Sequence, residues 1–280
     1  MAVLIRAHDN RNQPIIHGGA GQPLALTYFN LVRLGKGASY SGRVEGFETV
    51  YVVLTGKCNI TVNGTLFAGI GQRHDIWSGR ADSIYAPINA EVVIQSTAER
   101  TEVAIAGGIC DTAYAPFRIA PEEVDMVDVG SNETKSHRRI FHILGQKTVG
   151  RSGNLLVSEL YADEGCWSGY PPHKHDTERP PEETNFEEVY HYRFNPETGF
   201  GGQFCYDDTG AATAVMTRHG DTFLINHGYH PTVASPGHAG YIFTVLVGKQ
   251  QRSLIQYFDP AHRHLMSKIP GIQAMRDKFK

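Results

Sequence analysis

The feature that most constrains the fold is an internal repeat of strand-like segments, about half a chain apart in a sequence of 280 residues. The segment FETVYVVLTG aligns with FEEVYHYRFN, which matches Tyr51 with Tyr190, 139 residues later. The segments VAIAGG and TVLVGK repeat at nearly the same spacing, because Gly108 and Gly248 are 140 residues apart. Self-similarity at a fixed spacing indicates copies of one structural unit. We therefore predict two related domains in tandem.

Both halves consist of short β-branched and aromatic runs separated by Gly, Asn or Pro. No 3.6-residue periodicity persists in them, and this pattern is typical of an all-β sandwich or barrel. An alternating run predicts a strand over residues 24–34, and only the C-terminal tail has a helical pattern. We expect an all-β chain with domains at residues 1–130 and 131–280 and a short C-terminal helical tail.

Composition and charge narrow the classes of partner. With 41% hydrophobic residues, 20% charged residues and a net charge of −3, the chain lacks the electrostatics of a nucleic-acid or membrane binder. No apolar stretch approaches the ~20 residues of a membrane span, and the apolar run at the N-terminus is too short for a signal-peptide core. The four cysteines form no CxxC pair. We expect a cytoplasmic protein with reduced thiols whose partner is a small molecule.

The dense group of potential metal ligands lies in YPPHKHDTERPPEETNFEEVYHY. His173 and His175 are two residues apart in extended, proline-flanked backbone, where such side chains point to the same side. Glu188 follows in a strand, and His230 comes after a later apolar strand. An H-x-H pair alone is often a surface feature. Three imidazoles and a carboxylate, however, suit zinc, iron, manganese, cobalt or nickel and leave positions open for substrate oxygens.

These residues and the repeat resemble the cupins, small jelly-roll barrels with an H-x-H pair, a glutamate and a later histidine. In the cupin pattern the glutamate precedes a turn by about seven residues, which selects Glu188 over Glu187. Twelve residues separate the H-x-H pair from Glu188, more than is usual in cupins. The third histidine is one residue earlier than the usual spacing places it, so His227 remains the alternative to His230.

The N-terminal half has lost the equivalent ligands. Residues 39–43 stand where the H-x-H pair would be, and Thr49 aligns with Glu188. We expect this half to be a cupin-like barrel without a metal, and the C-terminal half to be the metal-binding barrel.

Together the two halves narrow the resemblance to one family. A bicupin of this length with PPHKHD, PPEET, EEVYHYRFNPETGFGGQ and INHGYHPTVASPG is similar to the 5-deoxy-glucuronate isomerases of myo-inositol breakdown. The resemblance implies two tandem jelly-roll β-barrels and a divalent metal, zinc first, with manganese, iron, cobalt or nickel as alternatives. It also implies aldose–ketose isomerisation of 5-deoxy-D-glucuronate to 2-deoxy-5-keto-D-gluconate. A related bicupin isomerase acts on the pectin-derived deoxy-hexosulose-uronate, which is the second substrate to consider.

This chemistry moves a proton between adjacent carbons through an enediolate, so it needs a Lewis acid and a proton-transferring group. Tyr190 and Tyr192 share the strand face of Glu188 if the alternation holds. They can equally be ordinary core aromatics. The loop carboxylates Asp176, Glu182 and Glu183 are the other candidates, and the sequence does not decide among them.

A uronate carboxylate requires a cation, and arginine suits its bidentate geometry. We prefer Arg179, in the long loop, over Arg193 and Lys174. Strand geometry directs Lys174 away from the metal, which predicts a position on the barrel rim. Alternation likewise predicts that Glu187 and His191 face outward.

Two other classes of function share the ligand set. A cupin with three histidines and a glutamate can be a metal-dependent dioxygenase, or a sugar-binding protein without catalysis. Exposed sheet edges also make a homo-oligomer reasonable.

Overall fold

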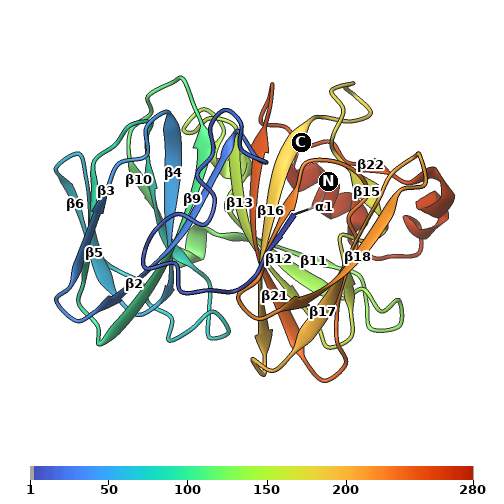
Figure 1. Ribbon diagram of the computed structural model, residues 1–280, viewed down its shortest axis with the longest axis horizontal. Coiled ribbons are helices and arrows are strands. Elements are labelled where there is room, and N and C mark those ends of the chain that lie inside the picture. Colours follow the sequence, from blue (N-terminus) through green and yellow to red (C-terminus); the bar gives the residue numbers. More distant parts are fainter. Residues whose placement is uncertain (1–2, 280) are drawn as a thin grey trace. The chain divides into compact units, whose positions relative to one another are not determined.

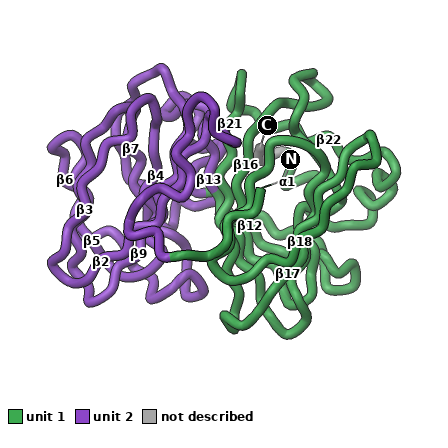
Figure 2. The backbone as a smooth tube through the Cα atoms, viewed as in Figure 1, with its two compact units in different colours: residues 1–8, 126–142, 158–280 green, residues 9–125, 143–157 purple. Residues whose placement is uncertain are grey.

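The computed structural model describes residues 3–279, which form two compact units (Figure 2). Unit 1 comprises residues 1–8, 126–142 and 158–280, and unit 2 comprises residues 9–125 and 143–157. Each unit is thus assembled from segments that are distant in sequence. The domains at residues 1–130 and 131–280 remain a sequence-based proposal.

Unit 2 contains a five-stranded and a four-stranded antiparallel sheet. The strand orders are β10-β7-β4-β9-β2 and β3-β8-β5-β6 (Figure 1). The predicted strand over residues 24–34 is observed as β2. The bounds are β2 Thr27–Gly35, β3 Ser39–Gly42, β4 Phe47–Thr55, β5 Cys58–Val62, β6 Thr65–Ile70, β7 Asp82–Ala86, β8 Val92–Ser96, β9 Arg100–Ile109 and β10 Phe117–Ile119.

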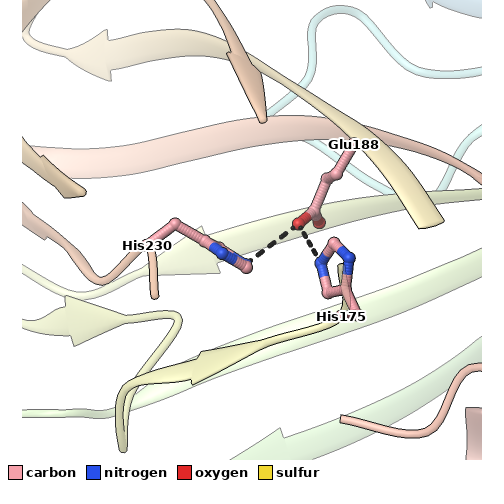
Figure 3. Close-up of side chains that lie close together, drawn as sticks. All are labelled: His175, Glu188 and His230. Carbon is pink, nitrogen blue, oxygen red and sulfur yellow. Dashed lines mark hydrogen bonds and ion pairs between the residues drawn. The ribbon is translucent and has the colours of Figure 1, made fainter. Parts of the chain in front are cut away.

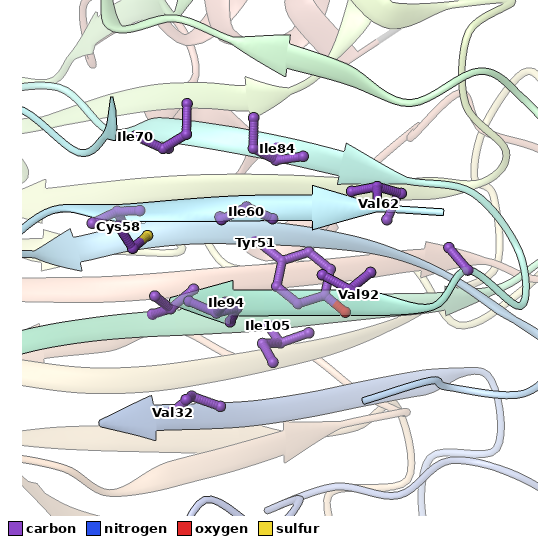
Figure 4. Close-up of a cluster of buried hydrophobic side chains, with 14 of the residues drawn as sticks. Val32, Tyr51, Cys58, Ile60, Val62, Ile70, Ile84, Val92, Ile94 and Ile105 are labelled. Carbon is purple, nitrogen blue, oxygen red and sulfur yellow. The ribbon is translucent and has the colours of Figure 1, made fainter. Parts of the chain in front are cut away.

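The core of unit 2 lies between these two sheets. Val32, Tyr51 and Ile105 from the larger sheet pack in one cluster with Ile60 and Ile94 from the smaller sheet (Figure 4). In β5 and β8 buried residues alternate with more exposed ones, because successive strand side chains point to opposite faces. Unit 2 is therefore a β-sandwich.

The β5–β6 hairpin illustrates how local sequence sets register in unit 2. Val62 pairs with Thr65, so Asn63 and Gly64 form the two-residue loop. Both have positive φ, 46° and 83°. Asn-Gly is the preferred sequence for such a turn because both residues tolerate this backbone region.

The second sandwich lies mostly in unit 1, and its strands β11, β12 and β13 each include residues of unit 2. One sheet has the order β1-β19-β16-β21-β13-β12-β11, another has the order β14-β20-β17-β18, and β15 pairs with β22. The bounds are β1 Val3–Ile5, β11 Asp125–Val129, β12 Arg138–Leu144, β13 Leu155–Ala162, β14 Trp167–Ser168, β15 His173–Lys174, β16 Phe186–Asn195, β17 Phe200–Tyr206, β18 Ala212–Arg218, β19 Thr222–Ile225, β20 Thr232–Ala234, β21 Ala239–Gly248 and β22 Tyr257–Phe258.

Strand β16 lies between β19 and β21, and its neighbours provide the core of unit 1. Tyr190, Tyr192 and Phe194 of β16 pack with Phe223 and Ile242 in one buried cluster. Strand β4 has the equivalent place in unit 2, between β7 and β9, and begins 139 residues before β16. The internal repeat in the sequence thus corresponds to a repeated strand position.

The C-terminal tail is helical, as the sequence predicts. A 3₁₀ helix, Pro260–Leu265, precedes the α-helix α1, Ile272–Phe279, and Asp259 caps the former by accepting a hydrogen bond from the amide of Ala261. The described residues contain no helix long and apolar enough to span a membrane. The predicted all-β fold with a short helical tail is confirmed.

Candidate metal centre

The predicted ligands come from three places in unit 1. His173 belongs to β15, which pairs with β22, and His175 follows it directly. Glu188 lies near the start of β16, paired with Ile225 and Leu246. His230 lies between β19 and β20. All four side chains are buried.

Three of the four side chains converge on one point (Figure 3). The Glu188 Oε2 atom is 2.9 Å from His175 Nε2 and 3.2 Å from His230 Nε2. One potential ligand atom from each residue lies within 4.8 Å of the others. These are the separations expected of ligands that share one ion.

His173 lies beside this group but outside it. Its ring centroid is 5.0 Å from that of His230 and 6.3 Å from that of His175. Its Nε2 is 2.9 Å from the side-chain nitrogen of Gln256, which donates to it. Gln256 was not predicted from the sequence, because it lies 83 residues away along the chain.

Main-chain carbonyls orient all three imidazoles. A carbonyl oxygen can only accept a hydrogen bond, so each Nδ1 carries the proton and each Nε2 of a neutral ring presents a lone pair. His175 and His230 turn their Nε2 atoms toward the carboxylate of Glu188, where either a proton or a metal cation can lie between nitrogen and oxygen. The Nδ1 contacts are His173 to Pro171 at 3.2 Å, His175 to Phe186 at 3.3 Å and His230 to Gly228 at 2.9 Å.

The His230 side chain supplies an independent test of this fit. Its Nε2 is buried and has no hydrogen bond of acceptable geometry, although Glu188 is near. A buried polar atom without a partner costs free energy, so such atoms are rare in proteins. A divalent ion would satisfy this atom, and the nitrogen and oxygen donors are those that zinc and other transition metals accept.

Interactions with the neighbouring histidines keep the carboxylate of Glu188 ionised. Burial opposes ionisation of Glu188, but the hydrogen bond from His175 and the nearby His230 outweigh it and lower its pKa to about 2. Burial also lowers the pKa of His173 well below its usual value, with His230 and His175 adding to the effect. A metal binds neutral imidazoles and an ionised carboxylate, so it would displace the proton that Glu188 favours on His175.

A cavity adjoins these residues. It contains about 460 Å³ not filled by protein atoms, part of it open to solvent. Its polar lining includes groups that can contact a sugar acid. These are Arg138, Ser158, His173, His175, Glu188, Tyr190, Thr244 and Gln256.

Comparison with known proteins identifies the family of this chain. A model of the KduI/IolB family matches residues 3–265. The chain belongs to the KduI/IolB family. The protein named 5-deoxy-glucuronate isomerase from Halalkalibacterium halodurans is 30% identical over 270 residues, 93% of this chain and 96% of that relative. Its namesake from Geobacillus kaustophilus is 34% identical over 248 residues, 88% of each chain.

Solved structures agree with this assignment. The IolB-like protein of Salmonella typhimurium LT2 superposes with a TM-score of 0.80 at 27% identity, covering 86% of this chain and 90% of its own. Oxalate decarboxylase of Bacillus subtilis has a TM-score of 0.59 at 12% identity, covering 83% and 71% of the two chains. The second likeness concerns the fold alone. Together they confirm the predicted bicupin fold of this KduI/IolB chain.

Three of the candidate catalytic residues, Tyr190, Tyr192 and Glu183, lie in different surroundings. Tyr190 lines the cavity beside Glu188. Tyr192 lines a different cavity, donates its hydroxyl proton to Gln203 and lies 3.3 Å from the hydroxyl of Thr232. Burial and the charge of Glu188 raise the pKa of Tyr190 well above its usual value, so it remains a phenol at neutral pH. Glu183 does not line this cavity.

Glu183 instead holds the loop together. It is fully buried and accepts hydrogen bonds from Lys174 at 3.1 Å and Arg179 at 2.8 Å, and from the amides of Asp176 and Thr177. Arg179, the preferred cation, and Lys174 are therefore both paired within the protein. The expectation that Lys174 lies on the rim is wrong, because it is 6% exposed and covered by its partners.

The positions predicted from strand alternation were also wrong for two residues of β16. Glu187 and His191 were expected to face outward, but they are 5% and 1% exposed. This central strand is buried on both faces over most of its length. Arg193, the third candidate cation, is partly buried in the same strand and does not line the cavity.

The cation that does line the cavity is Arg138. Sequence analysis missed it, although a signal was present. In the segment RRIFHILG, alternation places Arg138 on the same strand face as Ile140, and a strand face shared with a core isoleucine is an unusual position for an arginine.

Proposed function

We propose that this chain is a metal-dependent isomerase that converts 5-deoxy-D-glucuronate to 2-deoxy-5-keto-D-gluconate in myo-inositol breakdown. The observation that carries the proposal is the buried cluster of His175, Glu188 and His230 beside a cavity. It occurs in a KduI/IolB chain whose relatives, similar over nearly their whole length, are named 5-deoxy-glucuronate isomerase.

The proposed ligands of the metal are His173, His175, Glu188 and His230. When bound, a divalent ion, zinc first, with manganese, iron, cobalt or nickel as alternatives, would act as a Lewis acid toward the carbonyl and the neighbouring hydroxyl of the sugar. For His173 to join the other three, Gln256 must release the Nε2 lone pair to which it now donates. Its amide then becomes available to a substrate hydroxyl.

Tyr190 is the proposed catalytic residue of the protein itself. Conversion of an aldose to a ketose moves one proton between carbons and one between oxygens. Because the phenol is protonated at neutral pH, it can donate its proton to the carbonyl oxygen while accepting one from the neighbouring hydroxyl. Tyr192 and Glu183 are assigned structural roles.

The setting of the reaction follows from the same proposal. The cysteines Cys58, Cys110, Cys166 and Cys205 are all free thiols. Free thiols agree with a reducing compartment, so we place the enzyme in the cytoplasm, with a small uronic acid as its partner.

The direct test is incubation of purified, metal-analysed protein with 5-deoxy-D-glucuronate without oxygen, followed by NMR in deuterated water. The proposal predicts loss of the aldehyde signal and appearance of a ketone, abolished by a chelator and restored by a divalent ion. Absence of conversion by the metal-loaded protein would contradict it. Conversion of deoxy-hexosulose-uronate instead, or oxygen uptake, would then identify the alternative activity.

A further inference from the structure

Arg138 is a buried cation at the start of β12. Its side chain is 2% exposed, and it is among the largest fully buried side chains of the chain. The next residue on the same strand face, Ile140, lines the same cavity. Arg138 is therefore directed into the cavity and away from bulk solvent.

The hydrogen-bond acceptors of Arg138 are neutral carbonyl groups, so they do not neutralise its charge. Nη1 donates to the carbonyl of Ser136 at 2.8 Å, and Nη2 donates to the carbonyl of Tyr170 at 2.6 Å. Among the side chains that the structure describes, residues 3–276, no carboxylate forms an ion pair with it. A guanidinium has five N–H donors, so more than half of its donor capacity remains for another acceptor.

Two other arginines of this chain form ion pairs with buried carboxylates. Arg118 donates two hydrogen bonds to the buried Asp82, both of 2.8 Å. Arg179 donates two to the buried Glu183, of 3.0 and 2.8 Å. Both guanidinium groups are more exposed than that of Arg138. The most buried arginine thus lacks the partner that more exposed ones have.

A buried charge without a counter-charge is costly, because it has lost its hydration and gained no ion pair in return. Burial lowers the pKa of Arg138 to about 10, so it still carries its charge at neutral pH. Glu188 is the one carboxylate that lines the cavity, and it faces the histidines. An anion entering the cavity would therefore meet Arg138 as its unmatched counter-charge.

We propose that Arg138 binds the carboxylate of the substrate and so selects uronic acids over neutral sugars. This inference rests on the proposed function. Arginine offers a carboxylate two parallel hydrogen bonds, which fixes orientation as well as charge. The apolar Ile140 beside it suits the methylene group that adjoins the carboxylate of a 5-deoxy-uronate. The carbonyl end of the sugar then points toward His175, Glu188 and His230.

The test compares Arg138→Gln with the wild type on two substrates. One is 5-deoxy-D-glucuronate, and the other is 5-deoxy-D-xylo-hexose, which has a hydroxymethyl group in place of the carboxylate. Arg138→Gln should lower kcat/KM for the acid by about 100-fold, mainly through KM, because two charge-assisted hydrogen bonds are lost. It should change kcat/KM for the neutral sugar less than threefold. Arg138→Lys should restore part of the preference for the acid.

Arg139→Gln is the matched control, because Arg139 is adjacent in the strand and exposed. Its kinetics should equal those of the wild type. Equal losses of activity on acid and neutral sugar in Arg138→Gln would overturn the proposal. So would a wild type that does not prefer the acid, which needs no folded variant.

Binding measurements separate this proposal from the proposed function. Calorimetry on metal-loaded protein would compare the unreactive acid, obtained by reducing the aldehyde of the uronate, with its neutral alditol. Tighter binding of the acid to the wild type, lost in Arg138→Gln, would support the carboxylate site even if no isomerisation occurred. Equal affinity of both proteins for the acid would refute it.

Discussion

The residue on which the centre depends is Glu188. It is buried, and its Oε2 faces ring nitrogens of both His175 and His230. A glutamine at this position has nearly the same shape but does not neutralise a cation. The charge of Glu188 can therefore be tested separately from its volume.

Glu188→Gln should lose the metal and the activity together while the bicupin stays folded. Changes around metal ligands typically cost 10–100-fold in affinity, so removal of a charged ligand should cost at least about 100-fold. Metal analysis after dialysis, turnover and circular dichroism measure the three properties. Glu182→Gln is the control, because that side chain is 66% exposed. Full metal content in Glu188→Gln would contradict the ligand assignment.

In the metal-free protein, Glu188 and His175 should together contribute most to stability between about pH 4.5 and 6.5. The pKa of Glu188 is lowered from 4.5 to about 2 in the folded state, so its contribution is present above pH 4.5 and is lost as the pH falls toward 2. This contribution is about 3 kcal/mol. Burial acts to lower the pKa of His175, but the hydrogen bond to Glu188 outweighs it and raises the value above 6.5, so that contribution is lost as the pH rises through the raised pKa.

Urea unfolding of the metal-free protein from about pH 2 to above pH 6.5 would measure how the free energy of unfolding changes on the acidic and on the basic side. Glu188→Gln removes the carboxylate on which both shifts depend, so its profile should be flatter on each side. A wild-type profile as flat as that of the variant would show that these groups are not coupled in solution.

At the scale of elements, the loop after β15 holds the H-x-H pair in place through Glu183. Glu183→Ala would leave Lys174 buried without one of its partners and two amides without an acceptor. We expect a loss of about 3–5 kcal/mol in the free energy of unfolding and weaker metal binding. Denaturant unfolding and metal titration would measure these, with Glu182→Ala expected to change stability by less than about 0.5 kcal/mol. Weakened metal binding without loss of stability would point to a direct role in the site.

The sequence predicted what local spacing determines. The strands, the helical tail and the His173–His175 pair follow from periodicity over a few residues, and Glu188 and His230 follow from the cupin resemblance. Gln256 was missed because only the sheet topology brings it beside His173, whereas Arg138 had a local signal in the strand face that it shares with Ile140. Lys174 was misplaced because alternation gives the direction of a side chain but not what covers it.

At the scale of the whole molecule, the described part of the repeated fold contains one candidate metal centre. Thr49 of β4 has the strand position that Glu188 has in β16. The part of the chain that the structure describes contains a single cluster of three potential ligands, and it lies in unit 1. We therefore propose that only the C-terminal barrel binds a metal.

Thr49→Ala should therefore leave metal content and turnover unchanged. Its cost in stability should be about 1 kcal/mol, typical of a small buried truncation. Metal analysis and thermal unfolding would check this, with Glu188→Gln as the positive control for metal loss. Loss of metal from Thr49→Ala would overturn the alignment of the two barrels.

The most direct test of the central claim is a titration of metal-free protein with a divalent ion while ketose formation from 5-deoxy-D-glucuronate is followed. We predict no turnover before the ion is added and a linear rise that saturates at one ion per chain. Glu188→Gln should remain inactive throughout the titration. Full turnover by the metal-free wild type would contradict the proposed metal-dependent mechanism.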